Sequence, residues 1–222
     1  MGATEEFFQA VQAGPASKVD DMLRRDKSLL AAKSPKMGLS PVTVAAYFGQ
    51  TEVLQTILRH NPSLDVHEAA LVGNAERVRE LVDKDPRLIT AISKDGFPPL
   101  GLAAYMGQKD VVEYLVGKGS DLEHAAQGSG FTALTGAISN GHEEIVELLL
   151  RHGAKAEYHY EDGKLTPLHA AIMHGSVRMV KSLLEHGADP NAKMTTGQSA
   201  LGLAEGKDVP PIIDLLKQHG AK

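Results

Sequence analysis

Short apolar blocks, each closed by a glycine, recur along the chain and predict a series of paired helices. The clearest block lies at residues 165–192. There Thr166 can accept a hydrogen bond from a free backbone N–H and Pro167 suits the first turn, so the pattern predicts a helix that begins here and ends at Gly175. A second helix ends at Gly187, because glycine adopts the left-handed conformation that closes a helix.

The block is repeated, and the glycine that ends each first helix marks its phase. These glycines are separated by 35, 24, 34, 34 and 34 residues: Gly14, Gly49, Gly73, Gly107, Gly141 and Gly175. One pair of short helices cannot bury its apolar face alone, so stacked copies must share a continuous core. The third copy lacks the polar turn that precedes the others, and Asp65 opens its first helix directly after Asn61 and Pro62. We therefore expect a gap or kink between the turns at 36–37 and 94–95.

The best-preserved copy has TPLHAA at residues 166–171, then Gly175, then LLEHGAD at 183–189. This copy resembles the ankyrin repeat. The resemblance implies an all-α fold, an ankyrin-repeat solenoid of about seven helix-turn-helix units with short β-hairpin fingers, whose first and last units act as caps. It also implies a single domain over residues 1–222, with units at 4–36, 37–64, 65–92, 93–126, 127–159, 160–193 and 194–222.

Composition narrows the classes of partner. The 28 acidic and 23 basic residues are spread along the chain and leave a net charge of −5, which disfavours nucleic acid. The absence of cysteine excludes disulfides, thiolate zinc sites and a cysteine nucleophile, and it suits a reducing compartment. No apolar run approaches the roughly 18 residues of a membrane span. We therefore expect a soluble, cytoplasmic monomer that contacts neither nucleic acid nor membrane.

Candidate catalytic and metal-binding groups are few. Four histidines share one position near the end of the second helix of their units: His60, His152, His186 and His219. Neighbouring repeats stack about 10 Å apart, too far for two imidazoles to share a zinc ion, so we expect these rings to interact with the last carbonyls of their helices. The polar cluster at 158–162 and the glycines at 128–130 fit exposed turns. We expect no catalytic, cofactor-binding or metal-binding residues.

Candidate binding residues lie on the inner side of the array, which in the ankyrin family comprises the finger tips and the residues just before each helix-ending glycine. Aromatic residues there exceed what the packing of thin helices requires, and tyrosine is enriched where interfaces concentrate their energy. The missing finger of unit three should leave an opening above Leu71, and about half of the column next to the glycines should be mostly buried. The candidates are Tyr47, Phe48, Leu71, Phe97, Tyr105, Met106, Phe131, Asn140, Lys164, Leu165 and His174.

The resemblance implies a non-catalytic protein-binding scaffold that recognises another protein through its concave face without a cofactor. A small-molecule or metal-dependent enzyme would need titratable groups clustered in a closed pocket, which a shallow array of repeats seldom builds. A third interpretation, an injected effector or a toxin-neutralising partner, has the same fold and stays open.

Overall fold

The protein is built from pairs of short helices that stack side by side. A computed structural model describes residues 2–126, 130–157 and 165–222. Within these ranges fourteen α-helices form seven pairs, which we number as units one to seven. The inner helices are α1 (Ala3–Ala13), α3 (Pro41–Tyr47), α5 (Val66–Leu71), α7 (Pro99–Tyr105), α9 (Ala133–Ser139), α11 (Pro167–His174) and α13 (Ala200–Gly206).

The outer helices complete the pairs. They are α2 (Ala16–Arg25), α4 (Thr51–Arg59), α6 (Ala75–Lys84), α8 (Lys109–Gly117), α10 (Glu143–Arg151), α12 (Val177–Glu185) and α14 (Pro210–Gln218). Two 3₁₀ turns, η1 (Lys27–Ala31) and η2 (Pro86–Thr90), follow the outer helices of units one and three.

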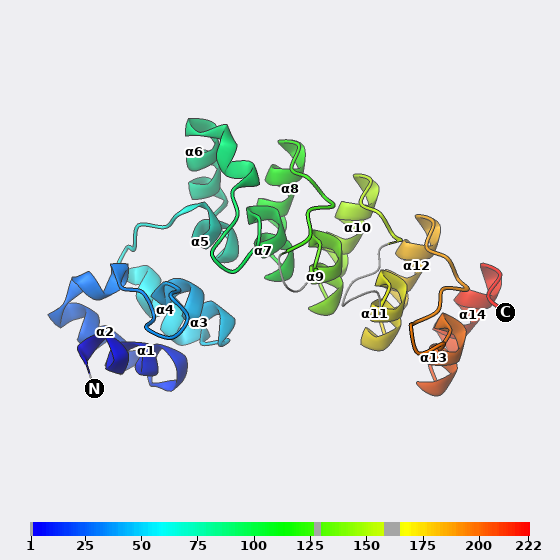
Figure 1. Ribbon diagram of the computed structural model, residues 1–222, viewed down its shortest axis with the longest axis horizontal. Coiled ribbons are helices and arrows are strands. Elements are labelled where there is room, and N and C mark those ends of the chain that lie inside the picture. Colours follow the sequence, from blue (N-terminus) through cyan, green and yellow to red (C-terminus); the bar gives the residue numbers. More distant parts are fainter. Residues whose placement is uncertain (1, 127–129, 158–164) are drawn as a thin grey trace.

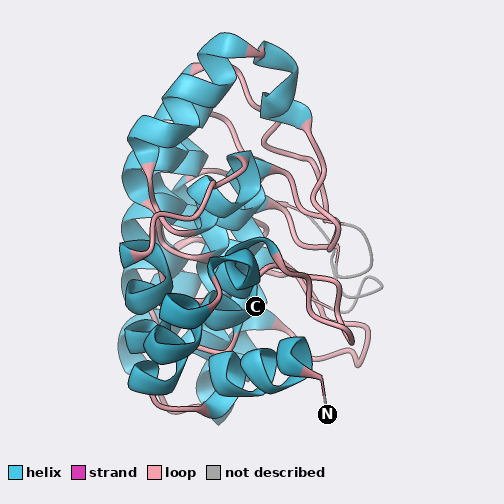
Figure 2. Cartoon of the chain, turned by 90° about the vertical axis from the view of Figure 1, so that its left-hand side faces the viewer, coloured by secondary structure: helices cyan, strands magenta, loops and turns pink. Residues whose placement is uncertain are grey.

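The units form an arch with two layers of helices. In Figure 1, α6, α8, α10 and α12 lie along the upper edge of the arch, and α7, α9, α11 and α13 lie below them. Figure 2 shows the helices on one side of the molecule and the connecting loops projecting to the other. Between the two layers, Leu100, Leu134, Leu149 and Leu183 are fully buried in one continuous core. The all-α solenoid expected from the repeat is confirmed.

Side-chain caps fix where most of the inner helices begin, with α1 and α7 as exceptions. Thr166 Oγ1 accepts a hydrogen bond from the backbone N–H of His169 at 3.4 Å and lies 2.9 Å from the Nδ1 atom of the same residue. Thr132 and Thr135 form a reciprocal capping box at the start of α9. Pro167 occupies the first turn of α11, where its missing N–H leaves no donor unpaired. Local residues therefore determine where these helices begin.

The loops between units are short fingers. Four of them show, among their described residues, a backbone hydrogen bond from an N–H to a carbonyl: Ser34 to Leu39, Ser93 to Phe97, Ala126 to Phe131 and Met194 to Gln198. The described ranges contain no β-strand, and their β pairing consists of isolated bridges, such as the one between Lys193 and Ser199. The fingers are thus hydrogen-bonded turns, a shorter form of the hairpins expected from the resemblance.

Side chains just after the helix-ending glycines tie neighbouring inner helices together. Three of them reach the backbone carbonyl that lies two residues before the glycine of the preceding unit: Gln50 to Gln12 (2.8 Å), Gln108 to Leu71 (3.1 Å) and His142 to Tyr105 (3.0 Å). Asn74 occupies the same position in unit three, but its side chain accepts from the backbone N–H of Arg77 in its own helix. Units two and three therefore lack this link.

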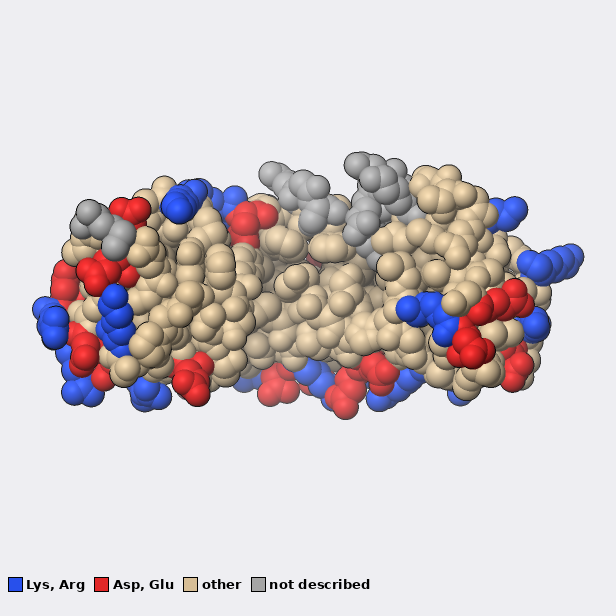
Figure 3. Space-filling view, turned by 90° about the horizontal axis from the view of Figure 1, so that it is seen from below, with Lys and Arg blue, Asp and Glu red and all other residues tan. Residues whose placement is uncertain are grey.

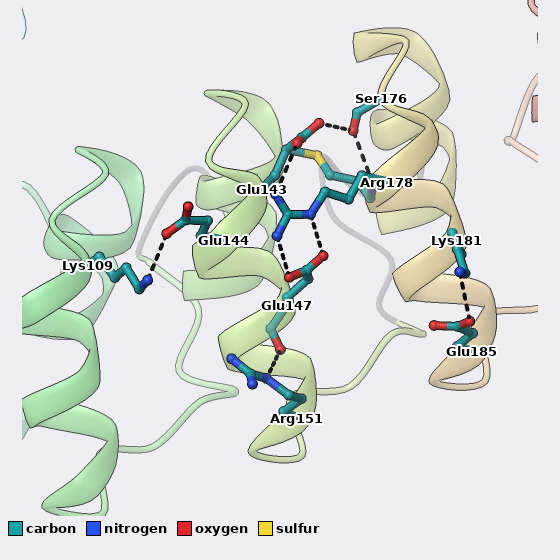
Figure 4. A network of polar contacts seen from close by, with 10 residues as sticks. Lys109, Glu143, Glu144, Glu147, Arg151, Ser176, Arg178, Lys181 and Glu185 are labelled. Atoms are coloured by element: carbon teal, nitrogen blue, oxygen red, sulfur yellow. Dashed lines mark hydrogen bonds and ion pairs between the residues drawn. The ribbon is translucent and has the colours of Figure 1, made fainter.

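Ion pairs join the outer helices on the opposite side of the arch. Figure 4 shows Lys109 of α8 beside Glu144 of α10, with Nζ and Oε2 2.7 Å apart. Arg178 of α12 contacts Glu147 of α10 through two hydrogen bonds of 2.5 and 2.7 Å. Solvent reaches all four side chains, with Glu147 the least exposed at 31%, so each pair contributes about 1 kcal/mol or less.

The stack is interrupted between units two and three. Asp65 and Glu68 form a capping box, so α5 begins directly after the six-residue segment 60–65. Helices α4 and α6 hardly touch, and no ion pair joins them among the described residues. Figure 1 shows the helices of units one and two turned relative to those that follow. The predicted kink is present.

Candidate functional site

The lower, inner side of the arch carries a broad uncharged surface. Figure 3 views the molecule from below and shows the charged side chains gathered at the two ends and along the edges, with an uncharged band between them. Tyr47, Phe48 and Met173, at the C-terminal ends of α3 and α11, each expose more than a third of their surface. An uncharged centre with a charged rim is typical of protein interfaces.

Six of the eleven candidate residues line one apolar hollow on this side, which has a volume of about 470 Å³. Three aromatic rings form a row along it, because the centroids of Phe97 and Tyr105 are 6.4 Å apart and those of Tyr105 and Phe131 are 6.5 Å apart. The sequence places these rings in units four and five, and the fold brings unit two beside them. The six lining candidates are Tyr47, Phe97, Tyr105, Met106, Phe131 and Asn140.

A second hollow, of about 220 Å³, lies over Leu71 where unit three has no finger. The fingers of units two and four form its walls, and the latter contributes Lys94 and Asp95. The Tyr47 hydroxyl donates a hydrogen bond to the Asp95 carboxylate at this wall. Partial burial of the phenol, together with this bond, raises the pKa of Tyr47 above its ordinary value. The opening predicted above Leu71 is present, and the Tyr47–Asp95 contact bridges it.

The remaining candidates differ in exposure. Phe48 and His174 lie on the surface, whereas Leu71 and Leu165 are buried and support the surface from below. Lys164 lies outside the described residues. In the column next to the glycines, about half of which was expected to be mostly buried, Val72 and Met106 are mostly covered, whereas Phe48, Asn140 and His174 are exposed.

Two residues of the site were not anticipated. Leu102 lines both hollows and packs with Ala46 and Leu71 in a small apolar cluster separate from the main core. Asp95 reaches Tyr47 only because no third finger stands between them. The missing turn in unit three could have indicated the role of Asp95 from the sequence, because without that turn nothing separates the fingers of units two and four.

The histidine column is structural. Nδ1 hydrogen-bonds the carbonyl four residues earlier in His152, His186 and His219, at 2.8, 2.8 and 2.9 Å, as predicted. His60 differs, since its Nε2 atom lies 2.7 Å from a carboxylate oxygen of Asp20 and links α4 to α2. In the part of the chain that the structure describes, no group of three or more histidine, aspartate and glutamate side chains could hold a metal ion. The predicted turns at 128–129 and 158–162 lie outside that part.

Comparison with known families gives a match over most of the chain. The family model of ankyrin repeats, in three copies, matches residues 45–126, 66–158, 119–194 and 155–222. A search of curated proteins gives no match. None of the described helices combines the length and the apolar character needed to cross a bilayer.

Proposed function

The chain belongs to the ankyrin-repeat family, and on that premise we propose that it is a non-catalytic scaffold that binds a partner protein through its concave face. Ankyrin repeats are generally protein–protein interaction modules, and the family is typically non-catalytic. Family membership supports the class of function but does not select the surface.

The observation that carries the choice of surface is the apolar hollow between units two, four and five. The rings of Phe97, Tyr105 and Phe131 form a row along it, and Figure 3 shows an uncharged band with a charged rim on the inner side of the arch. Half-buried aromatic rings around a hollow can bury further apolar area against an inserted side chain, and such anchors concentrate binding energy at interfaces. The outer helices instead present ion pairs that solvent already screens.

Affinity capture with purified bait proteins tests this assignment. Tyr105→Ala and Phe97→Ala should each weaken partner binding by about 1 to 2 kcal/mol or more, because each removes a ring from the hollow. Arg79→Ala and Glu147→Ala, on the outer helices, are matched controls that should leave binding near the wild-type value. Quantitative mass spectrometry of the captured proteins, followed by titration of the recombinant partner, measures the effect.

The variants must remain folded for the comparison to hold. Tyr105→Phe keeps the ring and its packing, so it separates loss of the hollow from loss of the hydroxyl, and circular dichroism checks the fold of every bait. Equal capture by the wild type and by both alanine variants would mean that the rings only cover the core. The expectations of a monomer and of a cytoplasmic location stay predictions, and light scattering checks the first.

A further inference from the structure

The junction between units two and three lacks links that hold other neighbouring units together. The side-chain bond to the preceding inner helix is missing because Asn74 caps its own helix. Among the described residues no ion pair or side-chain hydrogen bond joins α4 to α6, whereas Lys118 of α8 pairs with Asp83 of α6 and His60 contacts Asp20 of α2. The chain crosses this junction through the short segment 60–65, in which Asn61 has a left-handed backbone conformation and the Leu64 carbonyl accepts a hydrogen bond from Arg77 Nε of α6. Between the helices of units two and three, the main contact is the thin one between α3 and α5.

Two contacts bypass unit three, and both come from the finger of unit four. The Tyr47 hydroxyl at the end of α3 donates to the Asp95 carboxylate. The Lys94 ammonium lies against the backbone of Gly38 in the finger of unit two, where it leaves no room for a Cβ atom. These contacts connect units two and four directly, across the position of the missing finger.

The apolar hollow is divided by the same junction. Ala46, Tyr47 and Gly49 come from unit two, while Phe97 and Tyr105 come from unit four. A rotation of units one and two about segment 60–65 would therefore move one wall of the hollow relative to the other. The width of the hollow depends on the angle at the junction.

We propose that segment 60–65 is a hinge and that the Tyr47–Asp95 hydrogen bond is the latch that holds the apolar hollow in its closed form. Hinges of this kind are a few connecting residues that absorb the change in backbone angles. The consequence for binding rests on the proposed function, because a partner that fits only one width selects one hinge state. Losing a single hydrogen bond shifts the ratio of closed to open forms by roughly two- to tenfold.

Distance measurements between spin labels test the hinge without a partner. The chain has no cysteine, so two introduced cysteines are labelled uniquely. Gln55, Glu113 and Lys181 occupy the same exposed position on α4, α8 and α12, and each step between them spans two units. The pair Gln55→Cys and Glu113→Cys crosses the junction, whereas the pair Glu113→Cys and Lys181→Cys lies in the regular stack and serves as its control.

Removing the latch should change only the first pair. Tyr47→Phe, which keeps the ring, and Asp95→Ala should each add a second, longer distance across the junction and leave the control pair unchanged. Lys109→Ala breaks an ion pair within the stack and should alter neither pair. Unchanged distances across the junction in both latch variants would overturn the proposal, and an equal broadening of both pairs would show general loosening instead of a hinge.

The two proposals fail separately. If the latch variants open the junction but Phe97→Ala and Tyr105→Ala capture partner as the wild type does, the hinge stands and the assigned binding surface falls. If the junction stays closed while the ring variants lose the partner, the hinge falls and the surface stands. Circular dichroism of each variant confirms that the readout comes from folded protein.

Discussion

Neighbouring units are held together differently in the regular stack of units four to six and at the junction between units two and three. In the regular stack, a connection such as residues 186–199 carries a finger between one outer helix and the next inner helix. At the junction the connection is only residues 60–65, and the finger, the side-chain bond and the ion pair disappear together. Several independent contacts therefore couple neighbouring repeats, and the loss of one finger is accompanied by the loss of the side-chain bond and the ion pair.

Geometry explains why these links vanish together. Six residues reach at most about 20 Å when fully extended, so α5 must start close to where α4 ends. That constraint turns unit three relative to unit two and draws α4 away from α6. A side chain as short as Asn74 then finds its partner in its own helix. In a solenoid most contacts join neighbouring units, so the loss stays local apart from the contacts between units two and four.

Core truncation gives the largest expected difference between the two regions. Leu149 and Ile57 occupy the same repeat position and are fully buried. Leu149→Ala should cost about 2 to 5 kcal/mol, and Ile57→Ala should fall in the same range. Because coupling follows contacts, Leu149→Ala should lower the hydrogen-exchange protection of both α8 and α12, whereas Ile57→Ala should lower that of α2 and leave α6 protected.

A substitution that conserves volume distinguishes the effect of a cavity from the effect of changing the residue type at the same position. Leu149→Met should cost less than about 1.5 kcal/mol and leave the protection of α8 and α12 near that of the wild type. A loss of protection in α6 after Ile57→Ala as large as that in α2 would contradict the weak junction, because it would show that the core carries the coupling without help from the other links.

Backbone conformation at the ends of the outer helices gives the next effect. Gly119 after α8 and Asn61 after α4 both adopt the left-handed conformation, with φ of 84° and 54°. Gly119→Ala should cost about 1 to 2 kcal/mol, because alanine is strained there while no neighbouring atom lies within 4 Å of the new Cβ. Asparagine tolerates this conformation, so Asn61→Gly should change stability by only a few tenths of a kcal/mol.

Urea denaturation measures both changes against the wild type. Since neither substitution removes a core contact, the slope of the transition should stay constant and only its midpoint should move. A Gly119→Ala variant as stable as the wild type would show that the backbone after α8 can adjust to alanine. The backbone of the stack would then be no more constrained at this position than that of the junction.

Sequence periodicity predicted the helices, the core and the position of the kink, because each depends on local signals such as Thr166, Pro167 and the repeated glycines. Exposure of the inner column was harder to predict. Ala103 and Ala104 already fill the core side of α7, so Tyr105 and Met106 in its last turn are left partly exposed.

The second hollow and its bridging contact could not be predicted in detail. The missing finger was visible in the spacing, but the approach of Asp95 to Tyr47 depends on the angle between units two and four. That angle follows from the packing of several helices, and no short stretch of sequence specifies it.

The smallest expected effect concerns acid. Glu147 pairs with Arg178 between α10 and α12, and the hydrogen bonds from the guanidinium lower the pKa of Glu147 below its ordinary 4.5. A carboxyl group with a lowered pKa in the folded state stabilises the fold above its ordinary pKa, and that contribution is lost as the pH falls through the lowered value. Helices α4 and α6 share no such pair, so this effect of acid is expected between α10 and α12 and not between α4 and α6.

Hydrogen exchange and urea denaturation between about pH 6 and pH 3 measure this difference. Protection of α12 should fall below about pH 4.5 in the wild type and depend less on pH in Glu147→Gln, which cannot ionise. Asp20 is the counterpart in units one and two, where the hydrogen bond from His60 is the main cause of its lowered pKa. Asp20→Asn should therefore blunt the acid response of α2 and α4 without changing that of α12. If the protection of α12 depends on pH in Glu147→Gln as it does in the wild type, other carboxyl groups cause the acid sensitivity. This distinction between the two regions would then be lost.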